Sequence, residues 1–252
     1  MKGTAPIRRI TEGLLRITLP SLTRPAVKPT EEPTEELISW GIQYYVYSLV
    51  SHVRTVLKGL TKVSDAENIS AAFILCRHVF EWTAHTCYID QTLRGKYKEK
   101  LWREAWDLLS AVTLGNLWIK RYGEKYKAPQ IVGPVSADVP RPIRIGDAVT
   151  AYDEYLKQNH RKPDAQDSYG FLSEHAHPNS ACLQLYHTYS GNVVHFGDAN
   201  PTPSPLPLAN ACLIDLLMFV RDLLRISRET KIQPDVVALL KEIAKLASQQ
   251  RG

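Results

Sequence analysis

Apolar residues recur at helical spacings over long stretches of this chain, with polar residues in the positions between them. The first stretch follows Thr34, a favourable N-cap residue, and continues to about residue 60. Its apolar positions form one stripe, made of Leu37, Trp40, Tyr44, Tyr47, Val50 and Leu57. Such a stripe predicts a long amphipathic helix that buries one side in a core.

Helix signals continue through most of the remaining chain. Ser64 and Glu67 have the spacing of a capping box, which predicts that a second helix starts there and runs to about Gly95. Further helices are predicted over residues 98–122, 147–160 and 164–177, from Asn179 to Gly191, over 208–226 and from Pro234 onward. The alternation typical of strands is almost absent. The sequence therefore predicts an all-α fold, a single-core bundle of about seven to eight helices.

Prolines divide the chain and indicate its domain organisation. Residues 1–33 read as a basic arm punctuated by prolines, and residues 34–252 read as the helical bundle. A second proline-rich stretch, residues 127–146, predicts a long insertion loop within the bundle, and alternate prolines over 201–207 predict a polyproline-like crossing. The arm and the insertion loop are the segments expected to contact a partner, either nucleic acid or protein.

Composition places the chain among ordinary globular proteins. Of its 252 residues 44% are hydrophobic and 23% are charged, and no apolar run approaches the roughly 20 residues that cross a membrane. The net charge of +5 falls entirely within the first 30 residues, so a broad basic nucleic-acid face on the bundle is not indicated. Four cysteines in apolar stretches, without a Cys-x-x-Cys pair, favour reduced thiols and a cytoplasmic location. No membrane partner or cofactor is indicated, and the oligomeric state stays open.

The second predicted helix carries an unusual ionic face. Arg77, Glu81 and His85 follow one another in steps of four, which places them on the same side of an otherwise apolar helix. Enclosed charges must be paired or must change their protonation state. We therefore expect a polar partner for this face from another helix.

The segment Leu172–Asn179 is the best candidate for that partner. Glu174 and His177 are three residues apart and share a helix face, whereas His175 points about 200° away from His177. Pro178 disfavours helical geometry at His177, so the imidazole is expected in the last turn of the helix. Ser173 and His175 are further candidates for ligand contacts beside this pair.

If the two helices pack side by side, Arg77, Glu81, Glu174 and His177 form a pocket for a phosphate-bearing or carboxylate ligand. Arg77 would hold the anion, His177 would donate or accept a proton, and either glutamate would orient the imidazole. Such a set has the groups required for metal-free phosphodiester cleavage, with His85, Ser173 and His175 as additional ligand contacts.

Two other interpretations stay open. A buried Arg–Glu–His network can serve only to define helix register, in a non-enzymatic protein that contacts partners through its arm and loop. Alternatively, Glu81 with His85 and Glu174 with His177 supply a carboxylate and an imidazole from each of two helices, although the spacing at Glu81 departs from the Glu-x-x-His pattern of di-iron bundles. Phosphate-loop, dinucleotide-binding and nucleophile-elbow motifs do not occur in the chain.

The motifs Arg77-x-x-x-Glu81 and Leu172-Ser173-x-x-x-His177-Pro178 resemble those of an all-helical bacterial family known only as a domain of unknown function. By extension the architecture is similar to the HEPN class of helical bundles, which includes ribonuclease toxins and defence components. The resemblance implies a HEPN-like bundle over roughly residues 34–230. The chain departs from that class because no arginine is followed by a histidine after four to six residues, so the resemblance implies the fold more than the ribonuclease activity.

Overall fold

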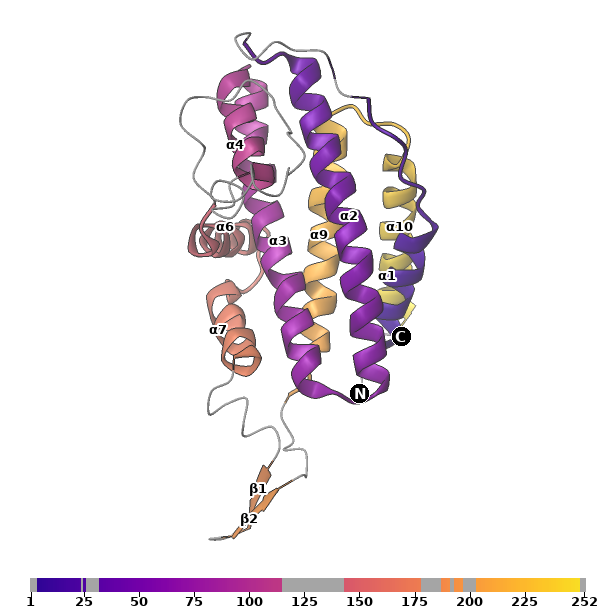
Figure 1. Cartoon of the computed structure of the whole chain (residues 1–252), viewed down its shortest axis with the longest axis vertical. Coiled ribbons are helices and arrows are strands. Elements are labelled where there is room, and N and C mark those ends of the chain that lie inside the picture. Colours follow the sequence, from indigo (N-terminus) through magenta and orange to yellow (C-terminus); the bar gives the residue numbers. More distant parts are fainter. Residues whose placement is uncertain are drawn as a thin grey trace, which may run out of the picture.

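The computed structural model describes residues 4–23, 25, 32–114, 143–177, 187–190, 193–196 and 203–249 of the chain. Within these residues the fold is helical apart from one short hairpin (Figure 1). The elements are α1 (Thr4–Arg16), α2 (Glu35–Asp65), α3 (Ile69–Lys98), α4 (Trp102–Leu114), α6 (Ile145–Gln158), α7 (Ala165–Ala176), β1 (His187–Ser190), β2 (Val193–Phe196), α9 (Leu206–Ile226) and α10 (Gln233–Gln249). The predicted all-α bundle is confirmed.

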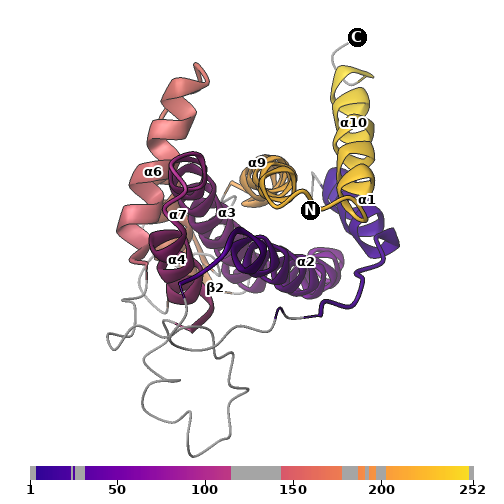
Figure 2. The same ribbon diagram turned by 90° about the horizontal axis from the view of Figure 1, so that it is seen from above.

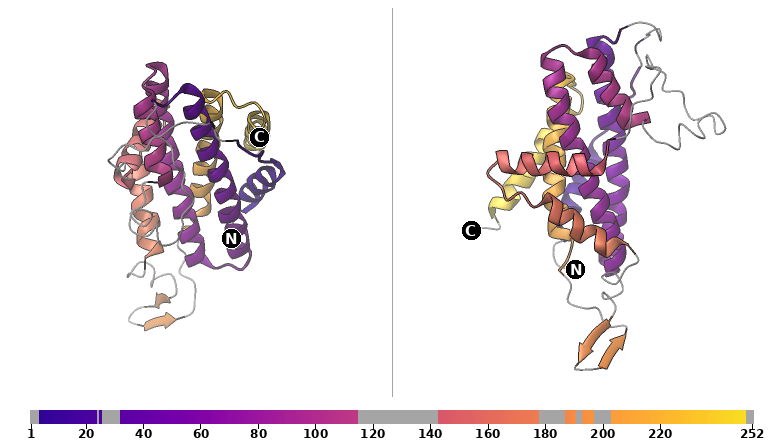
Figure 3. Two further views of the ribbon diagram at one scale, coloured as in Figure 1. Left: turned by 45° about the horizontal axis from the view of Figure 1, so that its top comes forward. Right: turned by 90° about the vertical axis from the view of Figure 1, so that its left-hand side faces the viewer.

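Helix α3 is the centre of the bundle and packs against α2, α4, α6, α7 and α9. Seen from above, α6 and α7 lie on one side of α3, α2 and α9 lie on the other, and α1 and α10 form the outer layer beyond them (Figure 2). Helix α6 crosses the long helices at a steep angle (Figure 3). The core runs through all these contacts and is continuous, with Phe73, Phe80 and Phe219 among its largest fully buried side chains.

The prediction of an arm over residues 1–33 is wrong for its first half, because residues 4–16 form α1. Ile7, Ile10 and Leu14 are buried, and the helix packs against α2, α9 and α10. Arg54 of α2 donates to the carbonyl oxygens of Leu14, at 2.8 Å, and Ile17, which satisfies the end of α1. The apolar residues at helical spacing therefore make this segment a packed helix, although the segment is basic.

The predicted boundaries hold at some helix ends and fail at others. The hydroxyl of Thr34 accepts from the backbone N–H of Leu37, so this N-cap is confirmed. The capping box at Ser64 and Glu67 is wrong, since Ser64 is buried inside α2. Asn68 caps α3 instead, accepting from Ala71 at 3.0 Å.

The segment from residue 179 to 191 was predicted to be helical, but its residues 187–190 form β1, which pairs with β2 in an antiparallel hairpin. Most of the predicted insertion loop, residues 127–142, lies outside the described residues; Ile145 and Gly146 already belong to α6. Among the helices described, none is both long and apolar enough to cross a membrane.

Candidate functional site

The candidate site lies where α7 packs along α3. The imidazole of His175 stacks on Phe73 with ring centroids 4.6 Å apart, and Phe171 meets the Phe73 ring edge-on at 5.3 Å. Farther along α3, Phe80 approaches Tyr169 at 5.9 Å. These aromatic contacts fix the register of the two helices and bring their polar faces together.

Arg77 is the hub of the polar face. Its Nε donates to Oε1 of Glu81 at 2.9 Å, its Nη1 lies 2.7 Å from Nε2 of His177, and its Nη2 donates to the hydroxyl of Tyr169 at 3.2 Å. The guanidinium carbon also lies 5.5 Å from the centre of the Tyr169 ring, within reach of a cation–π contact. The side chains of Arg77 and Glu81 are 22% and 26% exposed, so this cluster faces solvent at one side.

The cluster favours the charged form of Arg77. Burial by itself lowers the pKa of the guanidinium, but the hydrogen bond that Arg77 donates to the Tyr169 hydroxyl and the charge of Glu81 outweigh it, so the pKa of Arg77 is raised. The positive charge is thus fixed in place by groups from both helices.

The contact with Arg77 defines the protonation state of His177. A guanidinium has donors only, so Nε2 of His177 must be the acceptor of this hydrogen bond. The imidazole is therefore neutral in this arrangement and carries its proton on Nδ1. Protonation of His177 would remove the acceptor and place two cations side by side.

The structure brings together three of the four residues that the sequence singled out as catalytic. Arg77, Glu81 and His177 meet, as described above. Glu174 is exposed and makes no hydrogen bond or ion pair within the described part of the chain, so it does not join them. A catalytic role for this cluster stays a prediction, and so does a structural one.

The three residues suggested as further ligand contacts lie in different surroundings. His85 is close enough to Glu81 to interact electrostatically, but burial lowers the pKa of its imidazole and outweighs the opposing effect of that charge. Nδ1 of His175 lies 2.8 Å from the carbonyl oxygen of Phe171, and its ring is sandwiched in the α3–α7 contact. The hydroxyl oxygen of Ser173 is buried without a hydrogen-bond partner among the described residues.

Sequence reasoning missed Tyr169. Its position follows the same spacing as the ionic face of α3, because Tyr169, Ser173 and His177 are also separated by four residues each. Two helix faces of matching period therefore oppose each other. The signal was present, but a tyrosine carries no charge that calls for a partner.

In the described part of the chain, no group of three or more His, Cys, Asp or Glu side chains is placed to hold a metal ion. The two-helix metal site of Glu81, His85, Glu174 and His177 consequently has no support among these residues.

Comparison with family models, with curated proteins and with solved structures finds no match to this chain. The function therefore has to be inferred from the geometry of the site itself.

Proposed function

We propose that the cluster of Arg77, Glu81, Tyr169 and His177 is a binding site for an anionic ligand, either phosphate-bearing or a carboxylate. The observation that supports it most is the guanidinium of Arg77, which is part-exposed and held in place from two helices. These hydrogen bonds use three of the five N–H groups that a guanidinium carries, so donors remain for an anion. A preorganised cation loses little side-chain entropy when it binds.

His177 extends the proposal to chemistry. An entering anion competes for Nη1 of Arg77 and releases Nε2 of His177, which then becomes available to take up or give a proton. With the positive charge of Arg77 beside it, this pair supplies the groups of a metal-free phosphodiester cleavage. Nucleic acid is included among the ligands to be tested because the predicted architecture resembles that of HEPN-like bundles, although the HEPN ribonuclease motif is absent from the sequence.

A cytoplasmic location is part of the same proposal. Cys76, Cys87 and Cys212 are buried and unpaired with one another, which suits a reducing compartment.

The test is isothermal titration of the protein with inorganic phosphate, a nucleoside monophosphate, short RNA and acetate. Arg77→Met keeps much of the apolar stem and removes the charge, and we expect it to weaken binding of the preferred anion by at least about tenfold. Arg225→Met, which removes an exposed arginine near the end of α9, is the matched control and should leave binding unchanged. If none of the four ligands binds folded wild-type protein, the proposal fails.

A second candidate function is a non-enzymatic interaction module in which the same cluster only holds α7 to α3. One observation favours it: His177 is the C-cap of α7, and the guanidinium of Arg77 complements the partial negative charge at that helix end. Under this interpretation Arg77→Met and His177→Ala lower the unfolding temperature and no anion raises it. Anion-dependent stabilisation of wild type that is lost in Arg77→Met separates the two functions.

A further inference from the structure

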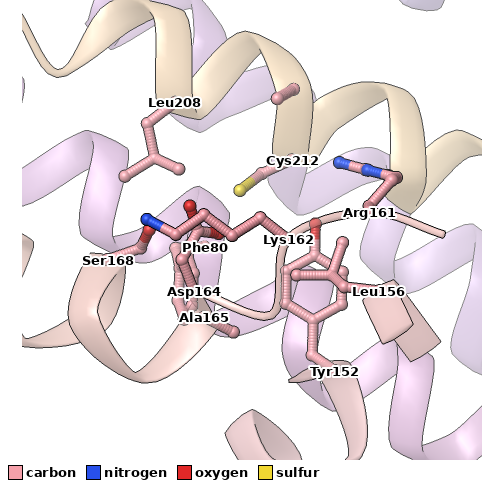
Figure 4. A pocket seen from close by; sticks show the side chains of 11 residues that line it. Phe80, Tyr152, Leu156, Arg161, Lys162, Asp164, Ala165, Ser168, Leu208 and Cys212 are labelled. Atoms are coloured by element: carbon pink, nitrogen blue, oxygen red, sulfur yellow. The ribbon is translucent and has the colours of Figure 1, made fainter. Parts of the chain in front are cut away.

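A separate cavity of about 380 Å³ lies at the start of α7, where α3, α6, α7, α9 and the loop after α6 converge. Figure 4 shows Lys162 extended across this cavity, with the Sγ of Cys212 directed into it. Its volume falls within the range of small-molecule sites. The residues of the Arg77 cluster do not line it.

A buried polar network supports one wall. Asp215, only 1% exposed within the apolar helix α9, accepts from Nη1 of Arg161 at 2.7 and 2.8 Å and from the hydroxyl of Tyr152. The charges of Arg161 and Asp215 therefore cancel, and the network holds the loop after α6 against α9. Tyr152 and Arg161 then line the cavity as fixed groups.

Cys212 lines the cavity but is not expected to act as a nucleophile. Burial and then the charge of Asp215 raise the pKa of its thiol to about 12, so the thiol is neutral near pH 7. Reactive chemistry at this sulfur is not expected.

Besides Arg161, whose charge Asp215 neutralises, the cavity is lined by two side chains of opposite charge, Lys162 and Asp164. Neither side chain makes an ion pair or hydrogen bond with any residue in the described part of the chain. Asp164 occupies the N-cap position of α7, but its side chain makes no capping hydrogen bond, and the N–H of the next residue, Ala165, donates to Asp153 of α6 at 2.7 Å. Asp164 lines the cavity, and its charge contributes to the raised pKa of the Cys212 thiol.

The rest of the lining is largely apolar and includes Phe80, Leu156 and Leu208. A simple anion would suit Lys162 but would face the charge of Asp164, and a simple cation would face the charge of Lys162. A small zwitterion satisfies both charges and can place an apolar side chain against the aliphatic wall. From this combination we propose that the cavity binds an apolar α-amino acid, with its carboxylate at Lys162 and its ammonium group at Asp164.

Three related ligands test this directly by isothermal titration: leucine, N-acetylleucine and leucinamide. Acetylation removes the positive charge of leucine, and the amide removes its negative charge. We expect leucine to bind and each derivative to bind at least about tenfold more weakly. The proposal is overturned if N-acetylleucine binds as well as leucine, since the cavity then takes a plain anion, or if leucine gives no binding to folded wild type.

Two variants test which charged group of the ligand binds Lys162 and which binds Asp164. Lys162→Met should abolish the preference for leucine over leucinamide, and Asp164→Asn should abolish the preference over N-acetylleucine. Both positions are at least partly exposed, so both variants should fold, and circular dichroism checks this. Lys157→Met, which removes an exposed lysine paired with Glu154, is the matched control. Arg77→Met should leave leucine binding intact, so failure here is distinguishable from failure of the Arg77 site.

Discussion

The Nε2 atom of His177 lies 2.7 Å from Nη1 of Arg77, although 100 positions separate the two residues in the chain. This contact joins the C-terminal end of α7 to α3 and makes the histidine an acceptor. Because an acceptor Nε2 requires the proton on Nδ1, one ring tautomer is enforced by the fold.

We predict that long-range ¹H–¹⁵N spectra at neutral pH show His177 with an unprotonated Nε2 and a protonated Nδ1. In Arg77→Met the constraint is lost, and the ring should exchange between tautomers. His160, which is exposed at the end of α6, serves as an internal reference for an unconstrained imidazole. A protonated Nε2 on His177 in wild-type protein would contradict the hydrogen bond.

The second prediction concerns Asp90, which is buried on α3 with Oδ2 accepting from Nε and Nη2 of Arg94 at 3.0 and 2.8 Å. Burial raises the pKa of Asp90 to about 6, although Arg94 opposes this rise. Because the pKa in the folded state is above the value of about 4 in an unfolded chain, the folded protein binds more protons between these values. The contribution of Asp90 to the free energy of unfolding should therefore fall by about 2 to 3 kcal/mol as pH rises from about 4 to about 6.

Urea denaturation across this pH range measures the effect. Asp90→Asn keeps an oxygen toward Arg94 and does not titrate, so the difference in stability between variant and wild type should change with pH by this amount. Equal pH dependence in the two proteins would show that Asp90 is not the titrating group.

A third prediction follows from Glu229, a buried carboxylate that joins α10 to α2. Its Oε2 accepts from the backbone N–H groups of Ile232 and Gln233 at 3.0 and 3.1 Å, and its Oε1 accepts from the hydroxyl of Tyr47 at 3.0 Å. We expect Glu229→Gln to lower the free energy of unfolding by about 2 to 3 kcal/mol, since the charge at the start of α10 and one acceptor are lost. Tyr47→Phe should lower it by only about 1 kcal/mol. Denaturant titration checks both, and a Glu229→Gln variant as stable as wild type would refute the capping role.

The fourth prediction concerns Gly95 and Gly13, where substitution by alanine should change the stability of the protein in opposite directions. A Cβ at Gly95 of α3 would meet no atom within 4 Å, so Gly95→Ala should stabilise the protein by about 0.5 to 1 kcal/mol through helix propensity. A Cβ at Gly13 of α1 would overlap the buried side chain of Leu239 on α10, so Gly13→Ala should destabilise by about 1 kcal/mol. Thermal unfolding of the two variants measures both effects. A Gly13→Ala variant that is more stable than wild type would contradict this packing of α1 against α10.

The meeting of Arg77, Glu81 and His177 could be predicted from the sequence because helix spacing and the need to pair enclosed charges both constrain it. Tyr169 could not be predicted in this way, since a phenol does not require a charged partner. The pairing of Asp215 with Arg161 also depends on tertiary packing alone: in the sequence Asp215 is one carboxylate within the apolar helix α9, and its partners come from α6 and the following loop.

Helix α1 shows a different kind of failure. Ile7, Ile10 and Leu14 have helical spacing, so the sequence contained the signal. The cluster of basic residues around them suggested a solvated arm, but Arg8 pairs with Asp65 of α2 and Arg16 with Glu242 of α10. The charge of this segment is therefore partly matched by the bundle on which it packs.

We propose above that Arg77 and His177 form an anion site rather than a purely structural contact between α3 and α7. The most direct measurement is an NMR titration with inorganic phosphate that follows the Arg77 Nε–H and the His177 ring resonances together. We expect both sets of resonances to move along one saturable curve, and we expect neither the curve nor the His177 shift to survive in Arg77→Met. Resonances that stay fixed at phosphate, nucleotide and acetate concentrations far above physiological levels, in a protein that His177→Ala clearly destabilises, would contradict this proposal.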